Sequence, residues 1–343
     1  MPEASDGEVA RVGVAMPTQE HERWVHDGTN VAAQLEALGH QVTLEYADDD
    51  SATQAAQVRH MIEDGADALI IGAVDGSALI DVLAAAADIP VISYDRLILG
   101  TSTIDYYATF DNERVGIQQA TSLLQGMGVL DATGRETGAE GPFAIELFAG
   151  SPDDNNAGFF FDGAMDTLRP FLDDGTLVVP SGQTSFDAVA TPGWSEDLAA
   201  ERMAALLDST YGGGEELHGV LSPFDGISRG VIGALQAAGR GPTISEGLPV
   251  VSGQDAERDS VVLVDDGVQL STIFKDTRQL AEVAVSAVHQ LLNGEEPEAN
   301  DLTTYDNGQI TVPAYLLTPQ LVTRDNYQHL LVESGYYEAG DLA

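Results

Sequence analysis

Charged side chains follow several predicted β-strands, at positions from which they could bind a ligand. Asp95 and Arg96 end a short apolar segment, and Asp255 and Lys275 follow two later ones. In an open parallel sheet, ligands bind beyond the carboxyl ends of the strands. A carboxylate accepts hydrogen bonds and a guanidinium donates them, so an adjacent Asp–Arg pair can satisfy a hydroxyl group from two sides. The alternative interpretation of Asp95 and Arg96 is a structural ion pair at a strand end.

Residues 151–162, SPDDNNAGFFFD, place carboxylates and amides next to three phenylalanines. One aspartate, Asp153 or Asp154, is expected to cap the helix that begins here. The other polar groups, Asn156 among them, exceed what a cap requires and predict hydrogen bonds to another molecule. Successive helical residues point in different directions, so we expect one or two phenylalanines in the core and one, Phe160, beneath a ligand. Hydroxyl-binding groups beside an apolar surface indicate a sugar.

An arginine and two tryptophans are further candidates for ligand-binding residues. Arg23 and Trp24 follow the first predicted strand. We expect Arg23 to face the ligand, whereas Trp24 either stacks on the ligand or packs in the core. Trp194 lies in a loop before a helix, a position that suits an aromatic wall or, alternatively, packing on the surface of its domain. Asp225 ends another predicted strand and is included for the same reason as Asp95.

Lys275 is the only lysine in the chain. Where all other cationic side chains are arginines, a single retained lysine indicates a specific contact. We therefore include Lys275 among the ligand-binding residues. The alternative is a salt bridge with Asp255 or Asp276.

Predicted strands and helices alternate along the chain. Short valine- and isoleucine-rich segments predict buried strands, and segments with a cap and a final glycine predict helices. The alternation restarts after residue 110, so we expect two doubly wound lobes of the α/β class, each a parallel sheet covered by helices on both faces. The predicted strands are 11–16, 41–46, 68–73, 89–95 and 106–110, then 142–150, 176–182, 218–225, 248–255 and 269–276.

Length and charge narrow the classes of function. At 343 residues the chain exceeds the usual size of one hydrophobic core, which also favours two domains. With 56 acidic and 14 basic residues, the formal net charge is −42, and such a surface repels phosphate backbones. Nucleic acid is therefore not expected as a partner. The same charge suggests a halophilic protein that works at high salt or, alternatively, an acidic secreted protein from a GC-rich genome.

The motifs of common enzymes and metal sites are missing. The sequence has no Gly-x-Ser-x-Gly elbow, no glycine-rich phosphate loop and no His-Glu-x-x-His motif. Cysteine is absent, which excludes disulfides and thiolate metal sites. The acidic run at 46–51 lacks the glycine and distal glutamate of an EF-hand loop, so its aspartates are expected to cap a helix. We predict a binding protein, not an enzyme, with no cofactor and no metal.

Several longer motifs resemble periplasmic sugar-binding proteins of ABC transporters, in the ribose-, xylose- and galactose-binding class. The similar stretches, between residues 11 and 337, include RWVHDG (23–28), SYDRLI (93–98), YYATFDNERVG (106–116), IELFAGSPDDNNA (145–157), VVSGQDAE (250–257), STIFKDTR (271–278) and LVESGYY (331–337). The resemblance implies the type I fold of periplasmic binding proteins, two Rossmann-like lobes joined by a three-strand hinge. The first lobe would comprise 1–110 and 276–306 and the second 111–275 and 307–343, with crossovers near 109–111, 274–276 and 307–312.

The resemblance also implies that a sugar is held in the cleft between the lobes. The first lobe would contribute Arg23, Asp95 and Arg96; the second would contribute Asp154, Asn156, Trp194 and Asp255, with Trp194 stacked on the pyranose face and Lys275 near a crossover. Two departures leave the sugar open. Phe224-Asp225 stands where xylose- and ribose-binding relatives have Asn-Asp, and the position near Phe160 or Phe161, an arginine in some relatives, is apolar. The cations Arg23, Arg96 and Lys275 would tolerate a sugar acid such as a uronate.

The function implied is that of a solute-binding protein of an ABC sugar importer, which binds an aldose or a uronic acid, closes about its hinge and docks on a membrane permease. The alternatives are a receptor for a furanosyl signalling molecule, a co-receptor for a membrane sensor kinase, and an enzyme acting on sugars. A DNA-binding repressor is not expected, because it would need a helix-turn-helix ahead of the first lobe.

We expect a periplasmic or extracellular location. Residues 1–10 lack the basic and apolar regions of a signal peptide, so we expect that such a peptide has been cleaved or, alternatively, that a lipid anchor is missing.

Overall fold

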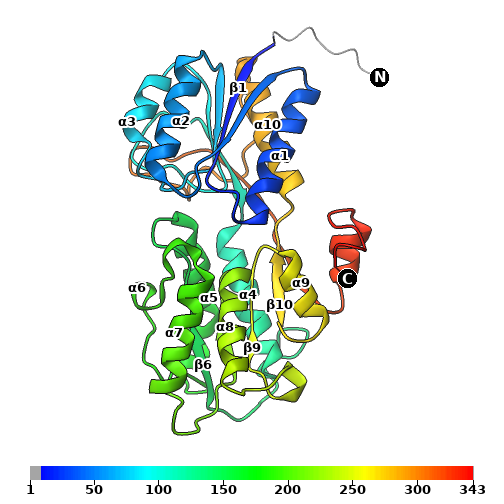
Figure 1. Cartoon of the computed structure of the whole chain (residues 1–343). Helices are drawn as coiled ribbons and strands as arrows, with labels where there is room; N and C mark the ends of the chain where they lie inside the picture. The colour runs from blue at the N-terminus through cyan, green and yellow to red at the C-terminus, as the bar shows by residue number, and fades with distance from the viewer. Residues whose placement is uncertain (1–8, 343) are drawn as a thin grey trace. The chain divides into compact units, whose positions relative to one another are not determined.

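The computed structural model describes residues 9–342, which form two compact units (Figure 1). Unit 1 comprises the chain up to Phe110 together with Asp276–Thr318. Unit 2 comprises Asp111–Lys275 and the chain from Pro319 onward. Residues 1–8 and 343, which the sequence analysis assigned to the two lobes, lie outside the described residues.

Unit 1 is built on a parallel sheet with the strand order β11-β5-β4-β3-β1-β2. All neighbouring strands in this sheet pair in parallel. Strands β3, β4 and β5 are buried over their whole length, as expected for a sheet that helices cover on both faces. The strands are β1 (Arg11–Met16), β2 (Gln41–Tyr46), β3 (Ala68–Ile71), β4 (Val91–Tyr94), β5 (Tyr106–Phe110) and β11 (Ala314–Leu317).

The helices of unit 1 form two layers around this sheet (Figure 1). Helices α1 (Glu22–Ala37) and α10 (Thr277–Leu292) lie side by side on one face, and α2 (Ser51–Glu63) and the short α3 (Ile80–Leu83) lie on the other. Asn30 Nδ2 donates to Thr277 Oγ1 at 3.2 Å, which ties α1 to the start of α10. Asp50 caps α2 by accepting from the Thr53 amide, which confirms that an aspartate of the acidic run at 46–51 is a helix cap.

Unit 2 contains a parallel sheet with the order β7-β6-β8-β9 and an antiparallel pair, β10-β12. The Leu270 amide donates to the Val251 carbonyl at 3.0 Å, and the Asp255 amide donates to the Ile273 carbonyl at 2.8 Å. Strand β10 therefore runs beside the segment that begins at β9. The strands are β6 (Phe143–Leu147), β7 (Leu177–Val178), β8 (Gly219–Leu221), β9 (Val250–Val251), β10 (Ser271–Phe274) and β12 (Gln320–Thr323).

Two pairs of long helices pack together in unit 2: α4 (Asn112–Gly126) with α5 (Asn155–Asp173), and α7 (Glu196–Ser209) with α8 (Asp225–Ala237). Helices α4 and α5 approach closely at Gly116, where an added Cβ would lie 1.9 Å from the Phe160 carbonyl oxygen. The shorter segments are α6 (Phe186–Val189), η2 (Pro192–Trp194), η3 (Ile244–Glu246), α9 (Arg258–Asp265) and the π-helical η4 (Gln328–Glu333).

One predicted boundary is wrong. Residues 307–318 were predicted to lie in the second lobe, with a crossover near 307–312, but they belong to unit 1. Strand β11 pairs with β5, and Asn307 Nδ2 donates to the carbonyls of Ile98 at 3.2 Å and Thr101 at 2.8 Å. The third division between the units therefore falls after Thr318.

Each unit has its own hydrophobic core. In unit 1, the central strands pack against α1 and α10. In unit 2, one cluster includes much of α7 and α8, and another includes much of α4 and α5. Within residues 9–342, no helix has both the length and the apolar character needed to cross a membrane.

Candidate functional site

In unit 1, one arginine holds two carboxylates near the carboxyl end of β4. Arg23 lies in the first turn of α1, Asp27 follows one turn later, and Asp95 comes directly after β4. Arg23 Nε donates to Asp27 Oδ2 at 3.1 Å, and Arg23 Nη2 pairs with Asp95 Oδ1. None of the three side chains is more than 7% exposed. Two buried carboxylates, each able to accept several hydrogen bonds, thus lie beside one guanidinium.

Tyr94, the last residue of β4, completes this group. Its hydroxyl donates to Asp27 Oδ1, and its side chain is fully buried. Burial and the charge of Asp27 raise the pKa of Tyr94, so its hydroxyl remains a donor. Asp27 was not predicted as a site residue. The signal was its spacing of four residues from Arg23, which places both side chains on one face of a helix.

Asp95 has an unusual backbone that several partners hold in place. Its φ of 60° lies in the left-handed region, which only a few non-glycine residues adopt. The Asp95 amide donates to the Ala108 carbonyl at 2.8 Å. The Asp95 carbonyl accepts from Tyr107 Oη at 2.5 Å and from Thr109 Oγ1 at 3.0 Å. Such strained residues cluster at ligand-binding sites, where the surroundings fix them.

Trp24 supports two guanidinium groups. The guanidinium carbons of Arg23 and Arg96 lie 5.0 Å and 5.2 Å from the centroid of its ring. Arg96 Nη1 also donates to the carbonyls of Ala73 at 3.1 Å and Val74 at 3.3 Å. Trp24 is 4% exposed and belongs to the core of unit 1. The structure thus brings together Arg23, Trp24, Asp95 and Arg96, with Trp24 as the packed base of the group; their contact with a ligand stays a prediction.

In unit 2, the start of α5 accounts for the run of aspartates and asparagines. Asp154 caps the helix, with its Oδ1 accepting from the Asn156 amide at 2.9 Å. Asn156 Oδ1 accepts from Nδ2 of Asn112, the first residue of α4, at 2.9 Å. Among the described residues, the buried Nδ2 of Asn155 has no hydrogen-bond partner. Asn112 was not predicted as a site residue, because only the packing of α4 on α5 brings it to Asn156.

Three aromatic rings form a cluster near the end of β6. The Trp194 ring lies edge-on to Phe160, with centroids 6.3 Å apart, and to Phe224, with centroids 5.9 Å apart. An added Cβ at Gly150 would lie 2.0 Å from the Trp194 ring, so only glycine admits the indole there. Trp194 also has a left-handed backbone, with φ of 55°. Within residues 9–342, its buried Nε1 has no hydrogen-bond acceptor, and leaving such a donor unpaired is costly.

Asp255 and Lys275 form an ion pair in unit 2. Lys275 Nζ lies 2.8 Å from Asp255 Oδ1, and the side chains are 2% and 9% exposed. The same Nζ lies 5.6 Å from the centroid of the Phe160 ring. Asp255 has a φ of 89°, so it shares the left-handed backbone of Asp95. The structure therefore joins Lys275, Asp255 and Phe160 with the aromatic cluster.

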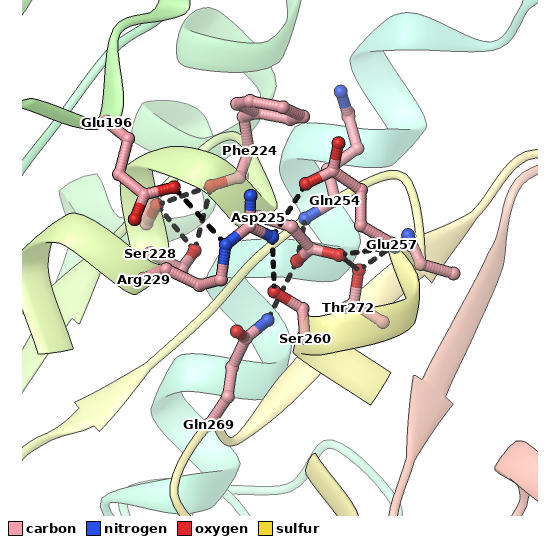
Figure 2. A network of polar contacts seen from close by, with 12 residues as sticks. Glu196, Phe224, Asp225, Ser228, Arg229, Gln254, Glu257, Ser260, Gln269 and Thr272 are labelled. Carbon is pink, nitrogen blue, oxygen red and sulfur yellow. Dashed lines mark hydrogen bonds and ion pairs between the residues drawn. The ribbon is translucent and has the colours of Figure 1, made fainter. Parts of the chain in front are cut away.

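Asp225 does not occupy the position expected of a ligand contact. Its side chain is 0% exposed. Its Oδ1 accepts from the Gln254 amide at 3.1 Å and from Gln269 Nε2 at 2.8 Å. Its Oδ2 accepts from the Glu257 amide at 2.9 Å and from Thr272 Oγ1 at 2.9 Å. Both oxygens are thus used within the protein, and the prediction that Asp225 contacts a ligand is replaced by a structural role (Figure 2).

Among the described residues, no group of three or more histidine, aspartate and glutamate side chains is arranged to hold a metal ion. The candidate groups are instead carboxylates paired with Arg23 or Lys275, amides at the start of α5, and aromatic rings. Such a set can hydrogen-bond several hydroxyl groups and contact an apolar ring face.

Comparison with known proteins identifies relatives over nearly the whole chain. Residues 12–296 match the model of the periplasmic binding protein domain. The chain is 50% identical over 333 residues to the multiple sugar-binding periplasmic receptor ChvE of Rhizobium radiobacter. The aligned region covers 96% of this chain and 92% of that protein. It is 48% identical over 328 residues to the multiple sugar-binding periplasmic protein SbpA of Azospirillum brasilense, covering 95% and 89%.

Solved structures share the fold. An ABC transporter solute-binding protein from Clostridium phytofermentans with bound β-D-glucose is 43% identical, with a TM-score of 0.91 over 97% of this chain and 100% of that chain. A carbohydrate transporter solute-binding protein from Chloroflexus aurantiacus in complex with D-glucose is 34% identical, with a TM-score of 0.83 over 96% and 97%.

Proposed function

The chain belongs to the periplasmic binding protein family, and we propose that it is the solute-binding protein of an ABC importer for monosaccharides. The relatives named above are receptors and binding proteins, not enzymes. Two of the solved structures contain glucose, which supports a monosaccharide as the ligand class.

One observation carries the proposal: each unit presents the same arrangement at a strand end. Asp95 in unit 1 and Asp255 in unit 2 both have left-handed backbones and carboxylates paired with buried cations, Arg23 and Lys275. A sugar hydroxyl donates one hydrogen bond and accepts others, so a carboxylate beside a cation satisfies both roles. The Trp194 N–H and the aromatic cluster add a donor and an apolar surface in unit 2.

The charges favour a neutral aldose over a sugar acid. Arg23 is balanced by both Asp27 and Asp95, and Lys275 is balanced by Asp255. Arg96 donates to two backbone carbonyls. A uronate carboxylate would meet Arg23 and Lys275 with their charges already compensated by carboxylates, and it would be desolvated at a cost. We therefore propose a preference for aldoses, and the tolerance of uronates stays a prediction.

In this proposal, Asp95 and Asp255 each contribute to the binding of the sugar. A ligand favours the conformation with which it makes the more favourable contacts, by its differential affinity for that conformation. The protein then delivers the sugar to a membrane permease from the periplasm. A membrane sensor kinase as a second partner stays a prediction, which co-purification with membranes in the presence of sugar would test.

Two measurements test the proposal. Native mass spectrometry of the purified protein should show a retained adduct with the mass of a pentose or hexose. Calorimetric titration of protein that has been unfolded, dialysed and refolded should then show one-site binding of D-glucose or another aldose, and weaker binding of D-galacturonate. If the refolded protein binds neither aldoses nor uronates, the proposed function is wrong.

A further inference from the structure

The turn that carries Asp255 contains two consecutive left-handed residues that are not glycine. Asp255 has a φ of 89° and Ala256 a φ of 49°. Side chains rarely adopt this conformation, and it persists only where neighbouring groups fix the backbone. The partners of this turn, residues 254–257, therefore decide where the Asp255 carboxylate lies.

Asp225 and Thr272 hold the turn from one side (Figure 2). The Asp225 carboxylate accepts from the amides of Gln254 at 3.1 Å and Glu257 at 2.9 Å, the first and last residues of the turn. The Thr272 hydroxyl donates to Asp225 at 2.9 Å and accepts from the Ala256 amide at 3.0 Å. With the Asp255 amide bonded to the Ile273 carbonyl, all four amides of the turn have partners.

The side chain of Glu257 is also fixed. Its Oε2 accepts from Arg229 Nη1 at 2.7 Å, and the same Nη1 donates to Ser260 Oγ at 3.1 Å. Figure 2 shows Arg229 reaching across from α8 to this pair and to Glu196. The end of the turn is thereby anchored to helices α8 and α9.

Tyr337 holds the turn through its carbonyl. Its hydroxyl donates to the Ala256 carbonyl oxygen at 2.9 Å, and its side chain is 5% exposed. The Tyr337 ring packs in a cluster with Ala256, Phe274 and Leu331, which joins the C-terminal segment to β10 and α9. The segment after η4 therefore contacts the same strained turn that Asp225 and Thr272 bind through its amides.

We propose that Asp225, Thr272 and Tyr337 are positioning residues for the Asp255 carboxylate, and that the C-terminal segment thereby sets the affinity for the ligand. This inference rests on the proposed function, in which Asp255 binds a sugar. Fixing the turn before the ligand arrives removes an ordering cost from the binding step. A change at Tyr337 then affects binding through Asp255 rather than through a contact of its own.

Tyr337→Phe tests this, since it removes the hydroxyl and keeps the ring. Calorimetric titration with D-glucose should show affinity weakened about 3- to 10-fold, the contribution of one neutral hydrogen bond. Tyr327→Phe is the matched control, because Tyr327 lies in the same cluster but its hydroxyl accepts from Gln328 Nε2 at 3.2 Å. That control should bind like the unmodified protein. Thr272→Val, which removes the acceptor of the Ala256 amide, should weaken binding at least as much as Tyr337→Phe.

A double-mutant cycle separates positioning from a general loss of stability. In the Asp255→Asn background, adding Tyr337→Phe should cause little further loss of affinity, because the group that it positions is already altered. An equal fold-loss in both backgrounds would overturn the proposal.

Amide hydrogen exchange without ligand makes the test independent of sugar. Exchange at residues 255–257 should accelerate in Tyr337→Phe and stay unchanged in Tyr327→Phe. Unchanged protection in Tyr337→Phe overturns the positioning role. Failure of the unmodified protein to bind any aldose would instead contradict the proposed function, and the exchange result would still decide the role of Tyr337.

Discussion

At the scale of residues, Asp255 and Lys275 show how a buried ion pair can serve both stability and binding. Their side chains are at most 9% exposed, and Nζ and Oδ1 are 2.8 Å apart. Removing one partner of such a pair leaves an uncompensated charge, whereas neutralising both is often tolerated. Stability and sugar binding can therefore be separated by substitution.

We predict that Lys275→Met lowers the free energy of unfolding by about 3 kcal/mol, because the buried carboxylate of Asp255 loses the positive charge of Lys275. The double variant Asp255→Asn/Lys275→Met should regain most of that stability in urea unfolding. Its affinity for D-glucose should stay at least tenfold weaker. A double variant that binds sugar like the unmodified protein would show that the pair is structural only.

The sequence predicts strand-end residues well and their surroundings poorly. Arg23, Asp95 and Lys275 were identified because they stand near predicted strand ends or are unusual in type, and the structure places each in a buried charge pair. Asp225 stands at the same kind of position, but four donors from other segments occupy its carboxylate. Those donors lie 29 to 47 residues away along the chain, so no local pattern reveals them.

At the scale of elements, the crossing of α4 and α5 positions the asparagines of unit 2. An added Cβ at Gly116 would lie 1.9 Å from the Phe160 carbonyl oxygen, and one at Gly163 would lie 2.2 Å from the Glu113 carbonyl oxygen. This close approach brings Asn112 Nδ2 within 2.9 Å of Asn156 Oδ1. The same contact fixes the part of α5 from which Phe160 reaches Trp194.

Gly116→Ala should push the two helices apart and destabilise the fold by about 1–3 kcal/mol, as overpacking does. Gly233→Ala is the matched control: Gly233 is an exposed residue within α8, and an added Cβ there meets nothing within 4 Å. That control should be neutral or stabilising by up to about 1 kcal/mol. Chemical unfolding of the two variants measures both expected changes in stability. Equal stability of the two variants would contradict the account of this crossing.

Most elements could be predicted because local pattern determines them. The predicted strands at 11–16, 41–46 and 106–110 match β1, β2 and β5. The third division between the units could not be predicted, since it depends on the pairing of β11 with β5, about 200 residues earlier in the chain. Neither an apolar run nor a cap marks which unit an isolated short strand will join.

At the scale of the whole molecule, the most prominent feature is the large excess of negative charge. The net charge of −42 implies that the acidic side chains repel one another. This repulsion is long-ranged in 0.01 M salt, where the Debye length is about 30 Å. It is short-ranged in 0.15 M salt, where the Debye length is about 8 Å. The single lysine is already engaged by Asp255, so it does not offset acidic groups on the surface.

The melting temperature should therefore rise steeply as sodium chloride is increased from low concentration to the molar range. Acidification toward pH 4 should shrink this salt effect, because carboxylates with ordinary pKa values of about 4 become protonated and the repulsion falls. Differential scanning calorimetry at both pH values checks the prediction. A melting temperature indifferent to salt at neutral pH would favour the alternative of an acidic protein from a GC-rich genome.

Asp95 and Asp255 are each proposed to contribute to the binding of a monosaccharide. Asp95→Asn and Asp255→Asn are matched variants, because both replace a carboxylate by an amide of the same shape at a left-handed position, which asparagine also adopts. Calorimetric titration with D-glucose should show one site in the unmodified protein and at least tenfold weaker binding in each variant. Unchanged affinity in either variant would contradict the claim, because the unit that carries that aspartate would not contact the sugar through it.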